Sequence, residues 1–585
     1  MPVVAVGALI SAALIYEHPS FVQAQSSQPL PAPSTAPCCW GGNSALGVAP
    51  REIDFPYYSL KDGFHSTLLL VSDSPQPVDL TIGIRNTFGQ MLTTTDTIQP
   101  QQKLAIDLAS TITKLGGDPT GAYAEGSVAV YFMGTIMPVV GQMTVTNPAL
   151  SLTHQVDMVE NDPGRSDIPA ALNGAWWGLG GGNSTKVMVS NTSDIPQFAN
   201  VYLDFQGKRH TLNPPLSFAP YETKVLDIAQ LIEGLGVDPA EASSGGITIV
   251  QVGPHPALIA NGKITDPATG FSSTSDFPAP DVQVASALHA VGLPIGKPTK
   301  DSPFAGAGTF IPHVVVRNLL STPQTVTITV EYPVAAVSSP VAAASLPPGV
   351  SSSSDAAAPP SPVGANQTAA GTPPLQGAGE AVLPVSSAST ALLDPVAAQD
   401  GKHSLPTGQY VLSPITVAGY STEDISLASV MNELPLPLPF CSIRIQYSGA
   451  PGSAEAEASS VESGSNMVVD ARAENEGNGW VGSGANPWHL DKDTDSVLFL
   501  TNMSDKPCPI GFEMTANGVH YYLTNLNLNP HETRAIDIRA LRDAHVADFK
   551  GNNIPAAATN GSVNWVRLDD VLVEGRLMVI KRHEG

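Results

Sequence analysis

Tryptophans beside glycines are the side chains of this sequence best suited to binding chemistry. Trp176 and Trp177 precede the run Gly178–Asn183, while Trp480 and Trp488 lie in a second stretch that contains glycine. The flat face of an indole can stack on a sugar ring, so these four residues are candidate glycan-binding residues. The interpretation favoured by sequence alone is packing on a neighbouring sheet, because tryptophan is mostly buried in folded proteins.

The glycine run itself resembles a phosphate-binding loop only in composition. It lacks the Gly-Lys-Ser/Thr ending that places a lysine on the phosphates. A strand, and not a helix, is predicted to follow it, at Lys186–Asn191. We therefore expect no nucleotide site here.

Three carboxylates, Asp491, Asp493 and Asp495, are spaced like the first ligands of a calcium loop. That loop requires glycine at its sixth position and glutamate at its twelfth, where this chain has Ser496 and Asn502. The favoured interpretation is the polar start of a strand, and a weak extracellular calcium site is the alternative. No other cofactor is expected.

Catalytic motifs are missing from the sequence. The 13 histidines include no HExxH pair, and no G-x-S-x-G elbow is present. We therefore predict a protein that is not an enzyme. A hydrolase with a site assembled across repeats is the less favoured alternative.

The elements that position these residues are organised around a nine-residue phrase that occurs four times. Its copies are Pro100–Leu108, Pro220–Ile228, Gly419–Leu427 and Pro530–Ile538. Asp107, Asp227 and Asp537 each stand before a short helix-like segment, where an aspartate satisfies free backbone N–H groups as an N-cap. The third copy has Ser426 instead, so a structural role is favoured over a catalytic one.

A hairpin is predicted before each phrase. Its first strand ends at Asp73, Asn191, Asn318 or Asn502, and its second strand alternates apolar and polar residues, as in an antiparallel sheet. The number of residues between hairpin and phrase is similar in the first, second and fourth copies and much larger in the third copy. The excess falls on residues 333–405, which are rich in Ala, Ser and Pro and are predicted to form a disordered insertion.

The Asn-ended hairpin and the Pro-x-x-Thr-x-x-Ile-Asp-Ile phrase resemble those of the tandem immunoglobulin-like modules of bacterial secreted and surface proteins of uncharacterised function. The resemblance covers most of residues 60–585 and carries no catalytic residues. It implies an all-β chain of four tandem immunoglobulin-like antiparallel β-sandwich repeats, each with a short helical turn. It also implies a structural or adhesive role at the cell surface.

These patterns divide the chain into segments. We predict a signal peptide at 1–24, a Pro/Ser/Gly-rich leader at 25–50, repeat 1 at 51–160, repeat 2 at 161–275, repeat 3 at 276–447, a flexible spacer at 448–484 and repeat 4 at 485–585.

Charge limits the possible partners. Lys and Arg total 27 against 52 Asp and Glu, a net charge of −25. Such a chain repels phosphate backbones, so nucleic acid is not an expected partner. Surface glycans and other extracellular proteins are the partners that the sequence allows.

Export is predicted from the first residues. An apolar run at Val3–Tyr16 is followed by Val22-Gln23-Ala24, a small-residue cleavage pattern. No Lys or Arg precedes the run, so a misassigned start or a weak anchor are alternatives. No later segment is expected to span a membrane, which places the mature chain outside the cell or on its surface.

The four cysteines are Cys38, Cys39, Cys441 and Cys508. Four cysteines allow three pairings, and the sequence does not choose among them.

Overall fold

The computed structural model describes residues 49–581 except for positions 73, 75, 101, 135–138, 151, 162–170, 254–256, 278–284, 300, 301, 303, 334–406, 436, 465–467, 477–482, 493, 517–518, 549 and 570. The predicted signal peptide, nearly all of the leader and the insertion lie outside these residues. So do Cys38, Cys39, Trp480 and Asp493. The described residues belong to one compact unit, Leu46–Gly585.

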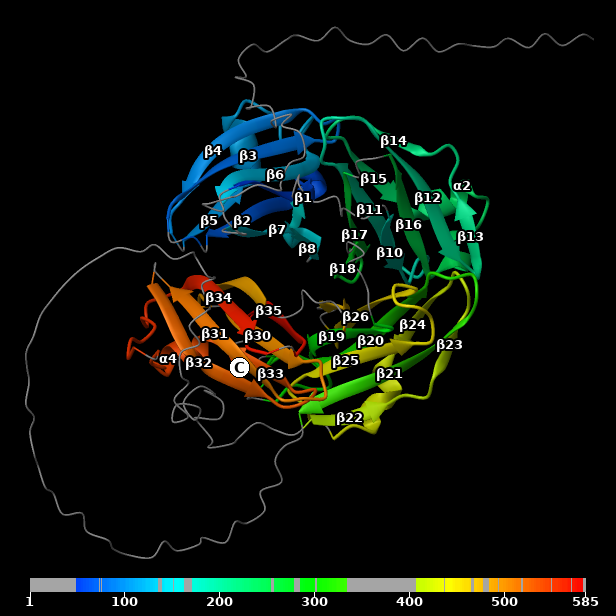
Figure 1. Cartoon of the computed structure of the whole chain (residues 1–585). Coiled ribbons are helices and arrows are strands. Elements are labelled where there is room, and N and C mark those ends of the chain that lie inside the picture. The colour runs from blue at the N-terminus through cyan, green and yellow to red at the C-terminus, as the bar shows by residue number, and fades with distance from the viewer. Residues whose placement is uncertain are drawn as a thin grey trace, which may run out of the picture. The chain divides into compact units, whose positions relative to one another are not determined.

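The described chain is all-β, as predicted, and its strands pair antiparallel in several sheets. Four regions follow one another, coloured from blue to red in Figure 1, and each contributes two sheets. We number them region 1 (residues 49–161), region 2 (171–276), region 3 (285–475) and region 4 (483–581).

Region 1 contains the sheets β4-β3-β6-β1-β9 and β5-β2-β7-β8. Their strands are β1 (Ala49–Ser59), β2 (His65–Ser72), β3 (Val78–Asn86), β4 (Met91–Ile98), β5 (Lys103–Asp107), β6 (Glu125–Gly134), β7 (Val139–Asn147), β8 (Leu152–Asp157) and β9 (Val159–Asn161). One cluster of buried apolar side chains draws on both sheets, with Ile82 and Val130 from the first and Leu70 and Met143 from the second. The alternation along β3 therefore places one of its faces in a core shared by the two sheets.

Region 2 contains β10-β16-β12-β13, with β14 also paired to β12, and β15-β11-β17-β18. Its strands are β10 (Ala171–Trp176), β11 (Ser184–Asn191), β12 (Gln197–Phe205), β13 (Lys208–Thr211), β14 (Leu216–Phe218), β15 (Thr223–Asp227), β16 (Gly245–Val252), β17 (Leu258–Asp266) and β18 (Phe271–Asp276).

Region 3 contains β22-β21-β25-β19-β28, with β23 paired to β21, and β24-β20-β26-β27. Its strands are β19 (Ala287–Leu293), β20 (Thr309–Asn318), β21 (Gln324–Pro333), β22 (Thr407–Val411), β23 (Ile415–Val417), β24 (Thr422–Ser426), β25 (Cys441–Tyr447), β26 (Ala454–Ser463), β27 (Val468–Arg472) and β28 (Glu474–Asn475).

Region 4 contains β29-β34-β31-β32 and β33-β30-β35. Its strands are β29 (Ser483–His489), β30 (Thr494–Asn502), β31 (Cys508–Ala516), β32 (Val519–Leu528), β33 (Thr533–Asp537), β34 (Asn560–Arg567) and β35 (Val573–Lys581). Cys441 of region 3 and Cys508 of region 4 are buried free thiols.

The structure differs from the prediction at 448–484, where the sequence predicts a flexible spacer. Three strands, β26 to β28, lie in it, and β26 pairs along its whole length with β20. The cause is residue size: the buried apolar side chains of β26 are Ala454, Ala456 and Ala458. Alanine gives a weak hydrophobic signal, so the alternation with Glu455 and Glu457 reads as a polar linker.

Helices are short and follow the nine-residue phrase. They are α1 (Leu108–Lys114), α2 (Ile228–Gly234), the 3-10 helix η4 (Leu427–Asn432) and α4 (Ile538–Asp543), and the remaining 3-10 turns are η1 (Lys61–Gly63), η2 (Pro148–Leu150) and η3 (Pro239–Ala242). The carboxylates of Asp107, Asp227 and Asp537 accept a hydrogen bond from the backbone N–H three residues on, at 2.8, 3.3 and 2.9 Å. In the third copy the Ser426 hydroxyl accepts from the backbone N–H of Ala428, two residues on, at 3.4 Å.

Buried asparagines hold the second, third and fourth phrases against the preceding hairpin. The side-chain amide of Asn191, Asn318 or Asn502 donates to the carbonyl just before the phrase, at 2.9, 3.0 and 2.9 Å. The strand-end asparagines thus fix the turn through which the chain enters the phrase.

No helix in the described part of the chain has the length and apolar character needed to cross a bilayer.

Candidate functional site

The two adjacent tryptophans at the end of β10 point in opposite directions. Trp176 is fully buried in the core of region 2, and its indole N–H donates to the carbonyl of Ala242 at 3.0 Å. Trp177 instead packs with Ile264 and with Val315 of region 3. Successive residues of an extended chain face opposite sides, so only one member of the pair reaches the boundary between regions.

A glycine-rich turn then leads from Trp177 into β11. Gly178 has φ +68°, and a Cβ there would meet the side chain of Asn183 at 2.3 Å, so only glycine suits this position. The side-chain amide of Asn183 donates to the Trp177 carbonyl at 3.4 Å. The run that resembles a phosphate loop therefore closes a turn between two strands.

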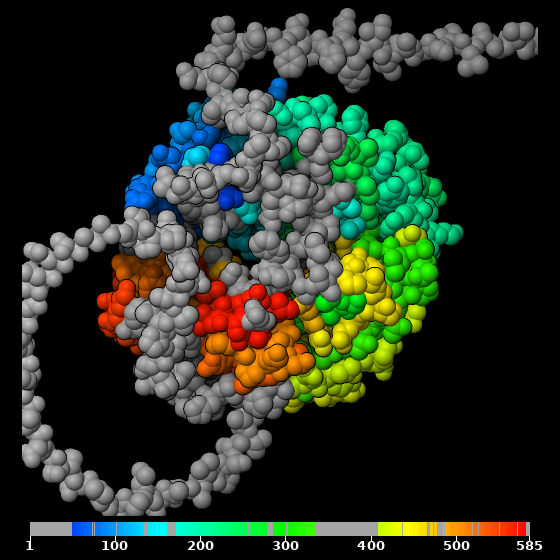
Figure 2. Space-filling model, in the orientation of Figure 1, coloured from blue at the N-terminus to red at the C-terminus, as the bar shows by residue number. Residues whose placement is uncertain are grey.

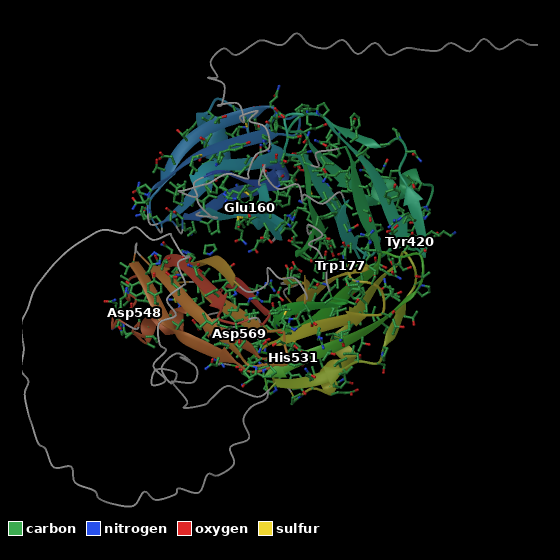
Figure 3. All side chains as sticks on the ribbon, viewed as in Figure 1. Glu160, Trp177, Tyr420, His531, Asp548 and Asp569 are labelled. Atoms are coloured by element: carbon green, nitrogen blue, oxygen red, sulfur yellow. The ribbon has the colours of Figure 1, made fainter. Side chains whose placement is uncertain are left out.

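Beside Trp177 lies a pocket of about 240 Å³ shared by regions 2 and 3. Figure 3 shows Trp177 where the two regions meet. Region 2 supplies the turn and Phe271, and region 3 supplies neighbouring strands of one sheet. The full lining is Trp177, Gly178, Asn183, Thr269, Phe271, His313, Asp424, Ser459 and Val461.

Strand register explains why the region 3 side chains of the pocket share a face. His313 of β20 stands opposite Ser459 of β26, and Asp424 of β24 stands opposite Val315 of β20. Positions 313 and 315 lie on one side of β20, since they are two residues apart. That side is the one that packs on Trp177, so the pocket continues the buried contact between regions.

His313 and Asp424 form a partly exposed hydrogen-bonded pair inside the pocket, with Nδ1 and Oδ1 separated by 3.2 Å. Together with Ser459 they have the residue types of an acyl-transfer triad. Two parts of such a site are missing from the described residues. No hydrogen bond joins Ser459 to His313, and the backbone around Ser459 is engaged in the β20–β26 ladder, which leaves no amide pair for an oxyanion. The arrangement suits binding better than covalent catalysis.

The other predicted site residues that the structure describes lie away from this pocket. Trp488 is buried, and its indole N–H donates to the carbonyls of Thr515 and Ser562 at 3.2 and 3.1 Å. Asp491 accepts a hydrogen bond from the Thr494 backbone N–H at 2.7 Å.

Asp495 forms an ion pair with Arg539. Within the described residues, no group of three or more His, Cys, Asp or Glu side chains could hold a metal ion.

Buried charges at the boundaries between regions were not foreseen from the sequence. Arg85, Asp204 and Glu331 lie near the end of the second hairpin strand of regions 1, 2 and 3, and all three are buried. Each is a charge at the end of a run of alternating apolar residues, which is the sequence signal that could have identified them. Figure 2 shows atoms of regions 2 and 3 in direct contact at one such boundary.

At the boundary of regions 1 and 2, Arg85 pairs with Asp54 at 3.0 Å and with Glu52 at 3.2 Å. Burial, with the nearby charge of Asp54, raises the pKa of Glu52 to about 8. The guanidinium of Arg85 also lies over the ring of Tyr221, with its carbon 4.5 Å from the ring centroid. Tyr221 is the second residue of the next phrase, so the ion cluster of one region contacts the phrase of the following one.

The boundary of regions 2 and 3 repeats this contact. Arg209, which pairs with Asp204, lies over the ring of Tyr420 at 4.4 Å. Arg317 of region 3 also reaches Asp204, at 2.7 Å, and donates to the carbonyls of Gly174 and Ile247 at 3.0 and 2.8 Å. Figure 3 places Tyr420 at this boundary.

At the boundary of regions 3 and 4, His531 takes the place of the tyrosine and lies 3.4 Å from Glu331. His289 pairs with the same carboxylate at 3.0 Å and approaches Glu574 of region 4 at 3.8 Å. Burial alone would lower the pKa of His289, but the two carboxylates outweigh it and raise the pKa to about 10. Burial raises the pKa of Glu574 to about 7.

The second residue of the phrase has the same backbone in these three copies. Tyr221, Tyr420 and His531 have φ of 59°, 51° and 55°, values that side chains larger than glycine adopt rarely. Each backbone N–H donates to a carbonyl in the turn of the preceding hairpin, at 3.1, 2.8 and 3.3 Å. The strained backbone is therefore held by its own region while its ring contacts the neighbour.

No protein-family model matches the chain, and no curated protein matches it at a significant level.

Proposed function

We propose that this protein is an exported, non-enzymatic scaffold of four immunoglobulin-like β-sandwich modules, with a structural or adhesive role at the cell surface. Each module corresponds to one region, its two sheets closing over a core. The apolar run at Val3–Tyr16 and the cleavage pattern ending at Ala24 support export. The alternation of apolar and polar residues in the strands, with two sheets in each region, supports the assignment of one β-sandwich to each region.

The observation that carries the proposal is the buried charge at successive boundaries. Domains joined in one chain move relative to one another unless their interface is large and well packed. Here Arg85, Arg317 and His289 are each buried beside carboxylates at a boundary. Each also contacts a neighbouring region, through the Tyr221 ring, the Asp204 carboxylate and the Glu574 carboxylate respectively. Moving the regions apart would break these contacts, including the buried Arg317–Asp204 ion pair, and the loss of a buried charged partner is costly.

Apolar packing reinforces the charged contacts. Phe499 of region 4 lies in the same buried cluster as Phe304 and Phe440 of region 3. Region 4 also contacts region 1, where β29 lies beside β7. The regions therefore hold one another at fixed positions, a property suited to a load-bearing or ligand-presenting scaffold and unsuited to a flexible tether.

Region-resolved hydrogen exchange of the full chain during urea unfolding tests the scaffold. We expect protected amides in β3, β12, β21 and β31 to lose protection at the same urea concentration, because the regions share buried groups. Loss of protection region by region, at well-separated concentrations, would contradict the proposal.

A further inference from the structure

We propose that the pocket between regions 2 and 3 binds a single neutral sugar ring. This inference rests on the proposed adhesive role and gives that role a site. It concerns the pocket lined by Trp177 together with Phe271, His313, Asp424 and Ser459.

The aromatic part of the pocket suits the apolar face of a pyranose. Trp177 is held between Val315 and Ile264, so its indole has a fixed orientation. Trp177 has a relative exposure of 7 %, and it still lines the pocket. A rigid ring contributes contact area at a small loss of conformational entropy, and Phe271 adds a second aromatic group in the same lining.

The polar part of the pocket suits hydroxyl groups. Asp424 supplies a carboxylate acceptor, Asn183 and Ser459 supply neutral groups, and His313 supplies a ring nitrogen beyond the one that faces Asp424. A hydroxyl both donates and accepts, so a mixed set of this kind can satisfy neighbouring hydroxyls of one ring. Hydrogen bonds to an ionised acceptor are about twice as strong as neutral ones.

The size of the pocket restricts the ligand to one ring. Its volume of about 240 Å³ lies below the ~300–1,000 Å³ of pockets that enclose drug-sized molecules. A longer glycan would place one residue in the pocket and extend over the surface. Because its walls come from two regions, the pocket exists only while those regions stay in contact.

Isothermal titration of the full chain with methyl pyranosides of glucose, galactose, mannose and N-acetylglucosamine tests this proposal. We expect at least one to bind with a dissociation constant on the order of 1 mM, the range for a small ligand with few contacts. Asp424→Asn, which keeps the shape of a half-exposed side chain, should weaken that binding at least about tenfold, since one charge-assisted hydrogen bond is lost.

The chain contains a matched control. His489 and Asp491 form a second histidine–aspartate pair, also 3.2 Å apart and partly exposed, outside the pocket. Asp491→Asn should leave sugar binding unchanged. Phe271→Ala, like Asp424→Asn, should weaken sugar binding, in this case without any change of charge.

Two results would overturn the proposal: no binding of any of the four glycosides by the folded wild-type chain, or equal losses in Asp424→Asn and Asp491→Asn. Neither bears on the scaffold, which the hydrogen-exchange experiment tests separately. A chain that unfolds as one unit and binds no glycoside would keep the scaffold and remove the site.

Discussion

Replacing Arg317 with methionine is the most direct test of how the regions are held together. Methionine has a similar length and fills the same space without charge. The change removes hydrogen bonds to the carbonyls of Gly174 and Ile247, to the Thr248 hydroxyl and to the Asp204 carboxylate, at 3.0, 2.8, 2.7 and 2.7 Å. All of these acceptors belong to region 2, so the loss falls on the boundary.

The magnitude follows from what is left behind. Removing one partner of a buried ion pair typically costs about 3–5 kcal/mol. Asp204 keeps two hydrogen bonds from Arg209, both at 2.8 Å, so its charge stays paired, whereas Glu455, 3.5 Å from Arg317, loses this partner. We therefore expect Arg317→Met to lower the free energy of unfolding by about 3 kcal/mol, at the lower end of that range.

Urea unfolding monitored by tryptophan fluorescence measures this cost, because Trp176 and Trp177 lie in region 2 close to the boundary. Hydrogen exchange in β16 and β20 adds a local measurement. Lys224→Met is the control: the Lys224–Glu222 pair is 2.8 Å long but partly exposed, and such pairs contribute about 0–1 kcal/mol.

The double variant Arg317→Met/Glu455→Gln refines the test. If the cost arises from the Glu455 carboxylate that is left without Arg317, removing that charge should make the double variant more stable than the sum of the single changes predicts. An Arg317→Met cost no larger than that of Lys224→Met would refute the argument that buried charges hold the regions together.

Two further predictions concern pH and export. Since the folded state raises the pKa of His289 to about 10, its contribution is complete below the unfolded pKa of about 6.5 and is lost as pH rises toward 10. Between pH 7 and pH 10 the free energy of unfolding should therefore fall more steeply in the wild type than in His289→Gln, and parallel curves would contradict this. The carboxylates and cations that face this group, Glu331, Glu574, His531 and Arg444, are common to both proteins. For export, N-terminal sequencing of the secreted chain should begin at Gln25, and an N-terminus at Met1 would indicate an uncleaved segment.

Local patterns in the sequence were sufficient to predict the β class and the positions of the helical turns. The alternation of Val78, Leu80, Ile82 and Ile84 depends on a single strand, and all four side chains are buried in β3. An aspartate before a short helix likewise needs only neighbouring residues to act as a cap. Such features can be predicted because each residue and the local structure that it determines lie within a few positions of each other.

Contacts between distant segments were beyond the reach of these patterns. Nothing near Arg317 in sequence indicates that its guanidinium meets Asp204, 113 positions away. The pocket shows the same limit: Trp177 was identified as a candidate, but Phe271, His313 and Asp424 were not. Their grouping depends on how two regions pack, which no single-strand pattern encodes.

The nine-residue phrase combines both kinds of information. Its last part is local, since Asp227 and Asp537 cap the helices that follow them. Its second residue acts at long range, because a ring at positive φ is directed at the charged cluster of the preceding region.

A residue that only turned the chain would be glycine, which adopts this backbone without strain. Tyrosine or histidine at these positions therefore indicates that the contact between regions outweighs the cost of the backbone. In regions 2, 3 and 4 the phrase therefore has two roles: its last residues cap the helix that follows, and its second residue contacts the region before it.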